Sequence, residues 1–196
     1  KRRLMAARLS TQLTAEFIGT FALIFIGAGA AALGLGGVVG VAFAHGLVVA
    51  TFASSYGPIS GLHVNPAVTV SVLVAKHISP RDAGLYIVVQ VLGGIVGALL
   101  LRFVLGGAET GLGATVLAQN LRIGDASVSV TPLAGLIVEI ILTFFLANAA
   151  LNTAIAKRGG DVAPLAIGLT LTFCILMGGP LTGASLNPAR TIGPAI

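Results

Sequence analysis

The sequence predicts an all-α polytopic membrane protein built as an inverted repeat, with three spans and one re-entrant half-helix in each half. Three observations lead to this fold class. Of the 196 residues, 56% are hydrophobic and only 9% are charged, whereas a soluble domain carries about 25% charged residues. Apolar runs of spanning length recur five times, and the two halves resemble each other at a nearly constant offset. A solvated surface cannot be built from this composition, so a lipid bilayer is the expected surrounding.

Five apolar runs provide the spans, because a spanning helix needs about 20 predominantly apolar residues. These runs cover residues 12–33, 38–56, 83–105, 132–154 and 164–179. Two shorter runs, 66–75 and 188–195, each follow a loop that contains Gly, Pro and Ser. About ten residues rise only about 15 Å as a helix, half of a bilayer. We therefore predict two re-entrant half-helices whose loops are buried in protein or line a wet cavity.

The internal repeat predicts the topology. Asn65 and Asn187 are 122 positions apart, and the same offset maps Gly46 onto Gly168, while an offset of 123 maps Glu16 onto Glu139. Three spans separate the starts of the two units, so the second unit enters the membrane from the opposite side. We expect one membrane domain over 1–196, with repeat one at about 10–105 and a truncated repeat two at about 132–196. The pattern also predicts a sixth span at roughly 205–227, beyond the printed sequence.

The distribution of Lys and Arg predicts the orientation. Most positive residues fall on one side of the predicted spans: Lys1, Arg2, Arg3, Arg8, Lys76, Arg81, Lys157 and Arg158. The positive-inside rule makes that side, and with it the N-terminus, cytoplasmic. The plasma (inner) membrane is the expected location, with a vacuolar-type membrane as the alternative.

Charge and cysteine content argue against other kinds of site. The formal net charge is +5, but the positive residues form short clusters without aromatic interleaving, so no nucleic-acid partner is predicted. The single cysteine, Cys174, lies within an apolar run, which rules out an intrachain disulfide and a Cys metal cluster. We predict no metal, no cofactor and no catalytic residue; Ser185 has no suitable base or acidic orienting residue nearby in the sequence.

The doubled Asn-Pro-Ala motif predicts a pore. The two copies are Asn65, Pro66 and Ala67, and Asn187, Pro188 and Ala189. Asn caps the free N–H groups of a helix, and Pro is favoured at the first helical position. Two such helix ends that meet at mid-membrane carry about half a positive charge each, and the Asn amides offer donors to a passing molecule. This junction would bind water and repel cations and protons.

Three charged residues lie at membrane depth. Arg190 follows the second motif, and Val68 takes the equivalent place in the first. We predict that Arg190 is a cation-excluding donor at a constriction, the alternative being a structural clamp on loop carbonyls. Glu16 and Glu139 are related by the repeat. We expect them to accept hydrogen bonds from the two half-loops, the loops that precede the half-helices at 66–75 and 188–195. The alternative, proton relay, would make the protein a coupled transporter.

Two histidines are candidate pore residues. His45 is polar within the second predicted span, so we expect it to line the pore, although a lone His on an apolar helix is more often a packing residue. His63 stands two positions before Asn65. It is expected either to line the cytoplasmic vestibule or to brace the first half-loop.

These features together resemble the aquaporin (major intrinsic protein) family over essentially the whole chain. The matching stretches are AEFIGTF at 15–21, SGLHVNPAV at 60–68, PLAIGL at 164–169 and SLNPAR at 185–190. The resemblance implies six spans, two half-helices, one pore per subunit and a homotetramer. It also implies a selectivity filter made of His45, Ile175, Ala184 and Arg190, a set similar to that of tonoplast-type members.

The resemblance implies a range of solutes. His45 and Ile175 stand where water-selective members commonly have Phe and His, so we expect a wider filter of different polarity. Water is the expected solute, with ammonia, urea and hydrogen peroxide as further candidates. Glycerol facilitators carry Asp after the second motif, where this chain has Thr191, so a glycerol-type facilitator is the weaker alternative.

Overall fold

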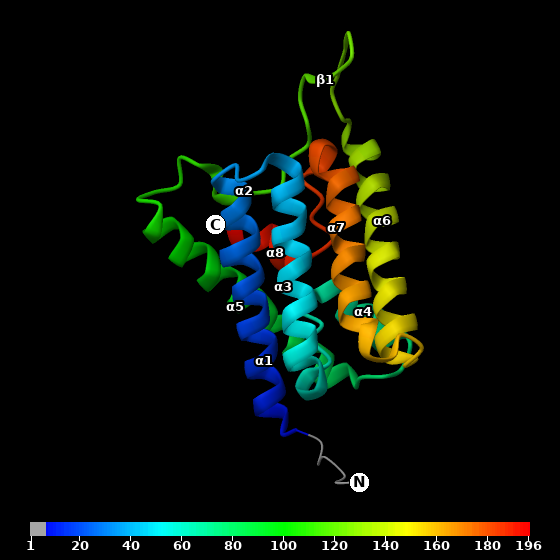
Figure 1. Ribbon diagram of the computed structural model, residues 1–196. Helices are drawn as coiled ribbons and strands as arrows, with labels where there is room; N and C mark the ends of the chain where they lie inside the picture. Colours follow the sequence, from blue (N-terminus) through cyan, green and yellow to red (C-terminus); the bar gives the residue numbers. More distant parts are fainter. Residues whose placement is uncertain (1–6) are drawn as a thin grey trace.

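The computed structural model describes residues 7–196, and its chain forms a bundle of long helices with two short helices inside it (Figure 1). Within these described residues, five helices are long and apolar enough to cross a membrane: Leu9–Ala32, Gly37–Ser60, Pro80–Val104, Pro132–Ile155 and Gly160–Thr182. The predicted all-α class and the five spans are confirmed, and the spans begin up to four residues earlier than the apolar runs suggested. Capping explains the earlier start at Pro80, since Ser79 accepts a hydrogen bond from the first turn of that helix; Thr131 caps the fourth span in the same way at the predicted residue, Pro132.

The first spanning helix is not a continuous α-helix. It comprises α1 (Leu9–Ala22), a π-helical segment η1 (Leu23–Ala28) and α2 (Gly29–Ala32). The fourth contains α6 (Pro132–Ala149), followed by a second π-helical segment η3 (Ala150–Ile155). The remaining helices are α3 (Gly37–Ser60), α4 (Pro66–Val74), α5 (Pro80–Val104), α7 (Ala163–Thr182) and α8 (Pro188–Ala195), with short 3-10 turns at η2 (Gly111–Gly113) and η4 (Gly160–Val162).

Close packing between helices depends on glycine, as the α3–α7 and α1–α5 contacts illustrate. Where α3 crosses α7, a methyl group on Gly46 would lie 2.6 Å from the Gly168 carbonyl oxygen, and one on Gly168 would lie 2.4 Å from that of Gly46. Where α1 meets α5, a methyl group on Gly93 would lie 2.5 Å from the Phe17 carbonyl oxygen. Small residues of this kind let membrane helices approach backbone to backbone. The α3–α7 contact joins residues that the repeat relates by its offset of 122.

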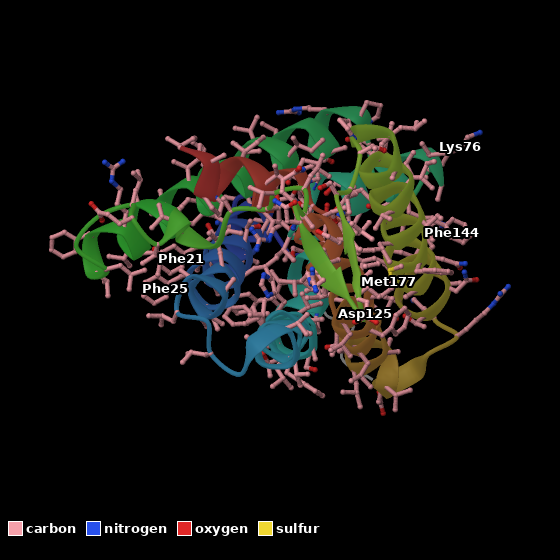
Figure 2. The ribbon with its side chains drawn as sticks, turned by 90° about the horizontal axis from the view of Figure 1, so that it is seen from above. Phe21, Phe25, Lys76, Asp125, Phe144 and Met177 are labelled. Atoms are coloured by element: carbon pink, nitrogen blue, oxygen red, sulfur yellow. The ribbon has the colours of Figure 1, made fainter. Side chains whose placement is uncertain are left out.

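Apolar side chains cover the outside of the bundle. Large hydrophobic residues with more than half of their surface exposed include Phe103, Leu133 and Phe144, and Figure 2 shows Phe144 on the outer side of α6. Such a surface suits contact with lipid. The protein is therefore an integral membrane protein, as its apolar spans predict.

A small β-hairpin is a feature that the sequence analysis did not anticipate. Strands β1 (Leu121–Ile123) and β2 (Ala126–Val128) pair antiparallel around Gly124 and Asp125. Gly124 has φ of +58°, as a tight two-residue hairpin requires. The hairpin projects from the end of the bundle opposite to the start of α1 (Figure 1).

The cationic residues predicted to be cytoplasmic gather at one end of the bundle. Arg8 precedes α1, Lys76 follows α4, Arg81 lies in the first turn of α5, and Lys157 and Arg158 follow η3. Figure 1 shows the start of α1, the connection from α4 to α5 and the connection from η3 to α7 at the same end of the bundle. Lys1, Arg2 and Arg3 lie outside the described residues.

Candidate functional site

The two half-helices begin at the doubled motif. Asn65 caps α4, and its Oδ1 accepts a hydrogen bond from the Ala67 N–H at 2.8 Å. Asn187 caps α8, and its Oδ1 accepts from the Ala189 and Arg190 N–H groups at 3.0 and 3.3 Å. Pro follows Asn at the first helical position in both cases. The half-helices and their caps therefore follow directly from the local sequence.

The two loops before these helices are joined by a reciprocal pair of hydrogen bonds. The Asn65 Nδ2 donates to the Leu186 carbonyl, and the Asn187 Nδ2 donates to the Val64 carbonyl, each at 2.9 Å. An amide nitrogen carries two hydrogens, so each Asn retains one further donor. Both side chains border a common cavity. The N-termini of α4 and α8 therefore meet inside the bundle, with one spare donor from each.

Both loops share an unusual backbone. Leu62 and Val64 have φ of +44° and +43°, and Ala184 and Leu186 have φ of +45° and +54°. These pairs are again related by the offset of 122. Positive φ at non-glycine residues costs about 1–3 kcal/mol each and needs support from the surroundings. Carboxylates accept N–H groups of both loops: Glu16 is fully buried, whereas Glu139 is only partly buried.

Glu16 holds the first loop. It is fully buried, and its Oε1 accepts from the Ser60 hydroxyl and the His63 N–H at 2.7 and 2.9 Å. Its Oε2 accepts from the Val64 N–H at 2.6 Å and from the Gln90 amide at 2.8 Å. Four donors thus surround one carboxylate.

Glu139 holds the second loop in the same way. Its Oε1 accepts from the Thr182 hydroxyl at 2.6 Å and the Ser185 N–H at 2.9 Å, and its Oε2 accepts from the Leu186 N–H at 2.8 Å. Ser60 and Thr182 were missed in the sequence analysis, although the offset of 122 relates them and could have identified both.

His63 borders the cavity and contacts α4 and α5; its place in a cytoplasmic vestibule stays a prediction. Its ring Nδ1 lies 3.2 Å from the Thr69 hydroxyl, and its ring centroid lies 5.2 Å from that of Tyr86. Thr69 also receives a hydrogen bond from the Gln90 amide at 2.9 Å. Gln90, at the centre of this network, was not predicted because a single polar residue within an apolar run gives no indication of its partners.

The cavity is bordered by Asn65, Asn187, His45, His63 and Arg190. His45 is 3% exposed, and its Nδ1 lies 2.9 Å from the Val41 carbonyl oxygen, which fixes Nδ1 as the protonated nitrogen. The Nε2 atom of His45 then has a free lone pair, and it has no partner among the described residues. An unpaired buried acceptor beside a cavity can receive a hydrogen bond from a molecule within it.

Arg190 separates this cavity from a second one. It borders both, whereas His45 borders only the first and Ile175 only the second. Its Nη1 donates to the Gly113 carbonyl at 2.7 Å, so the clamp considered as the alternative role is present. Its Nε has no partner among the described residues, so an unpaired buried donor lies on a side chain that borders both cavities. Ala184 is 1% exposed and borders neither cavity; its place in the filter stays a prediction.

The chemistry available at this site is hydrogen bonding. Among residues 7–196, no group of three His, Cys, Asp or Glu side chains could hold a metal ion. The Ser185 hydroxyl donates to the Asn187 carbonyl and contacts the Thr191 hydroxyl. The site can therefore pass hydrogen-bonding molecules between donors from two loops, and it offers no arrangement for nucleophilic attack.

Comparisons with known proteins agree with this geometry. A family model described as "Major intrinsic protein" matches residues 3–196. The chain is 40% identical over 185 residues to "Glycerol uptake facilitator protein-like 6" from Lactiplantibacillus plantarum, covering 93% of this chain and 82% of the relative. It is 44% identical over 200 residues to "Probable aquaporin TIP3-2" from Arabidopsis thaliana, covering 93% and 71%.

A solved structure has the same fold. The "X-ray structure of the aquaglyceroporin from Plasmodium falciparum" matches with a TM-score of 0.81 and 24% identity, covering 96% of this chain and 80% of that one. The likeness confirms the fold class predicted from the sequence.

Proposed function

The chain belongs to the major intrinsic protein family, whose members are passive membrane channels and not enzymes, and from this we propose that it conducts water through the passage between its two half-helices. The observation that carries the proposal is the reciprocal pairing of Asn65 and Asn187 at the head of two capped helices. Each Asn retains a donor at the cavity. A single file of water can accept these two hydrogen bonds in turn.

Exclusion of ions and protons is part of the proposal. The N-termini of α4 and α8 together place about one positive charge at the junction, and the Arg190 guanidinium adds a full charge at the next narrow point. Both repel cations, and the fixed donors orient water so that a continuous proton path is broken. In this proposal Glu16 and Glu139 hold the two loops in place and carry no protons. Their carboxylates accept hydrogen bonds from backbone and side-chain groups that position the loops.

Small neutral solutes are proposed as further cargo. His45 offers an acceptor and Arg190 a donor at the same passage. Ammonia, urea and hydrogen peroxide could each replace their hydrogen bonds to water by hydrogen bonds to these two side chains. The filter of His45, Ile175, Ala184 and Arg190 supports this wider range. We also propose an N-terminus on the cytoplasmic side of a plasma (inner) or vacuolar-type membrane, and assembly as a homotetramer.

Glycerol is a second candidate, favoured by the printed name of the relative from Lactiplantibacillus plantarum. The position after Arg190 bears on it, because glycerol facilitators carry an acidic residue there and this chain has Thr191. Water therefore remains the first proposal.

Stopped-flow light scattering on proteoliposomes tests these proposals. Water, urea, ammonia and glycerol are compared in parallel, with empty vesicles of the same lipid as the control. Water permeability well above that of empty vesicles, without gradient-dependent uptake, supports a passive water channel. Water permeability equal to that of empty vesicles would refute the proposal. Saturable uptake that depends on a proton gradient would favour the coupled transporter.

A further inference from the structure

The π-helical segment η1 lies beside the passage that the proposed function uses. The Gly29 N–H donates to the Ile24 carbonyl five residues earlier, so the hydrogen-bonded turn here encloses one residue more than that of an α-helix. Such π-bulges are rare and occur mainly at functional sites. Two neighbouring positions of this segment, Gly27 and Ala28, lie against His45 and against the loop that holds Arg190.

Gly27 lies directly against the imidazole of His45. A methyl group added at Gly27 would lie 2.6 Å from His45 Cδ2, 2.7 Å from Nε2 and 2.8 Å from Cγ. Contacts below 3.0 Å are not found for real Cβ atoms, so the ring would have to move by several tenths of an ångström or more. The ring is tied on its other side to Val41 by the hydrogen bond at Nδ1. The absence of a side chain at Gly27 thus provides the space that the ring occupies.

Ala28 supports the other half of the filter through the backbone. A methyl group on Gly113 would lie 2.2 Å from the Ala28 carbonyl oxygen, so the loop at Gly113 rests against the last residue of η1. The Gly113 carbonyl in turn accepts the hydrogen bond from Arg190 Nη1. One segment of six residues therefore positions both His45 and Arg190.

We propose that Gly27 is a specificity-determining position, because it sets where the His45 ring stands and hence the width of the passage beside Arg190. This inference rests on the proposed channel function. A side chain at 27 displaces the ring toward the cavity that the ring borders, and the passage narrows. Gly27 touches no solute, so it is a positioning residue that acts through His45.

The test is a double-mutant cycle on the full chain in proteoliposomes, read as water permeability per reconstituted channel, with urea permeability measured alongside. The variants are Gly27→Ala, His45→Ala and the two combined. One methyl group in a closely fitting site changes discrimination by about tenfold or more, so we expect Gly27→Ala to lower water permeability by about tenfold. In the His45→Ala background the same substitution should change it by less than about twofold, because the ring that it displaces is gone.

A matched control lies two residues along the same helix. A methyl group on Gly29 would meet only the end of the Leu101 side chain, at 3.3 Å, so Gly29→Ala should leave both permeabilities within about twofold of wild type. Equal losses for Gly27→Ala with and without His45 would overturn the inference and reduce Gly27 to a helix-packing residue. No loss for Gly27→Ala would overturn it as well.

Folding failure and failure of the proposed function are distinguishable outcomes. If Gly27→Ala alone does not fold, the inference requires that the combined variant does, because the clash is with the ring; a combined variant that also fails to fold refutes it. If wild-type protein does not exceed empty vesicles, the proposed function fails. A conducting wild type together with a fully conducting Gly27→Ala variant refutes only the role of Gly27.

Discussion

Glu16→Gln is a direct test of how the first half-loop is held. The substitution keeps the size of the side chain and replaces one oxygen by an NH₂ group. The retained oxygen can still accept from the Ser60 hydroxyl and the His63 N–H. The new NH₂ group faces the Val64 N–H and the Gln90 amide, both of which are donors in the native contacts.

The expected magnitude follows from counting the donors that lose an acceptor. The Gln90 amide can turn round and present its oxygen to the new NH₂ group. The Val64 N–H is fixed by the backbone and cannot adapt, so one buried donor is left unpaired. Such a group costs about 1–3 kcal/mol, and we expect Glu16→Gln to lower the free energy of unfolding by about this amount.

Unfolding in a graded mixture of mild detergent and SDS, followed by circular dichroism, measures the change. Glu109→Gln is the matched control, because Glu109 is exposed in the loop after α5 and its neutralisation should alter stability by no more than about 0.5 kcal/mol. Water permeability of the folded Glu16→Gln protein should stay near wild type. Equal stability of Glu16→Gln and wild type would refute the reasoning, and loss of gradient-driven uptake in a folded variant would support the transporter instead.

Three further predictions concern the junction and the helix contacts. Arg190→Val should raise proton and urea leak in proteoliposomes by about tenfold, equivalent to about 1.4 kcal/mol of barrier; unchanged selectivity would remove Arg190 from the filter. Asn65→Ala removes a helix cap and one of the two bonds between the loops, so it should cost about 1–2 kcal/mol in the same unfolding assay and reduce water permeability. Gly46→Ala should lower stability by at least about 1–3 kcal/mol, because its methyl group meets the α7 backbone. A methyl group at Gly57, on the same helix, would meet nothing within 4 Å, so Gly57→Ala should leave stability unchanged or slightly raise it. Similar losses of stability for Gly46→Ala and Gly57→Ala would exclude the α3–α7 contact as the cause.

Much of the fold could be predicted because the deciding information is local. The Asn-Pro pairs at 65–66 and 187–188 specify a cap and a first helical turn without reference to the rest of the chain. The spans follow from length and apolarity, and the repeat offset carries the topology. These rules depend on the neighbouring residues or on the solvent, and both can be read from a sequence.

The parts that could not be predicted depend on contacts between distant segments. The π-helical turn at Leu23–Ala28 lies within a run of apolar residues, and nothing in that run marks the position of the extra residue. The Gly113 carbonyl that holds Arg190 lies 77 positions away from it, in a loop without a motif. The four-donor environment of Glu16 likewise requires Gln90, which lies 74 positions away.

The reciprocal bonds between the two half-loops also constrain how the chain reaches its final state. The Val64 carbonyl receives its hydrogen bond from a side chain that is synthesised 123 residues later. Until then the first half-loop, with its peptide groups at membrane depth, lacks its partner, and a bare carbonyl in hydrocarbon is costly. The two halves must therefore close on each other as a late, joint step of biogenesis, and a defect in either half leaves both incomplete.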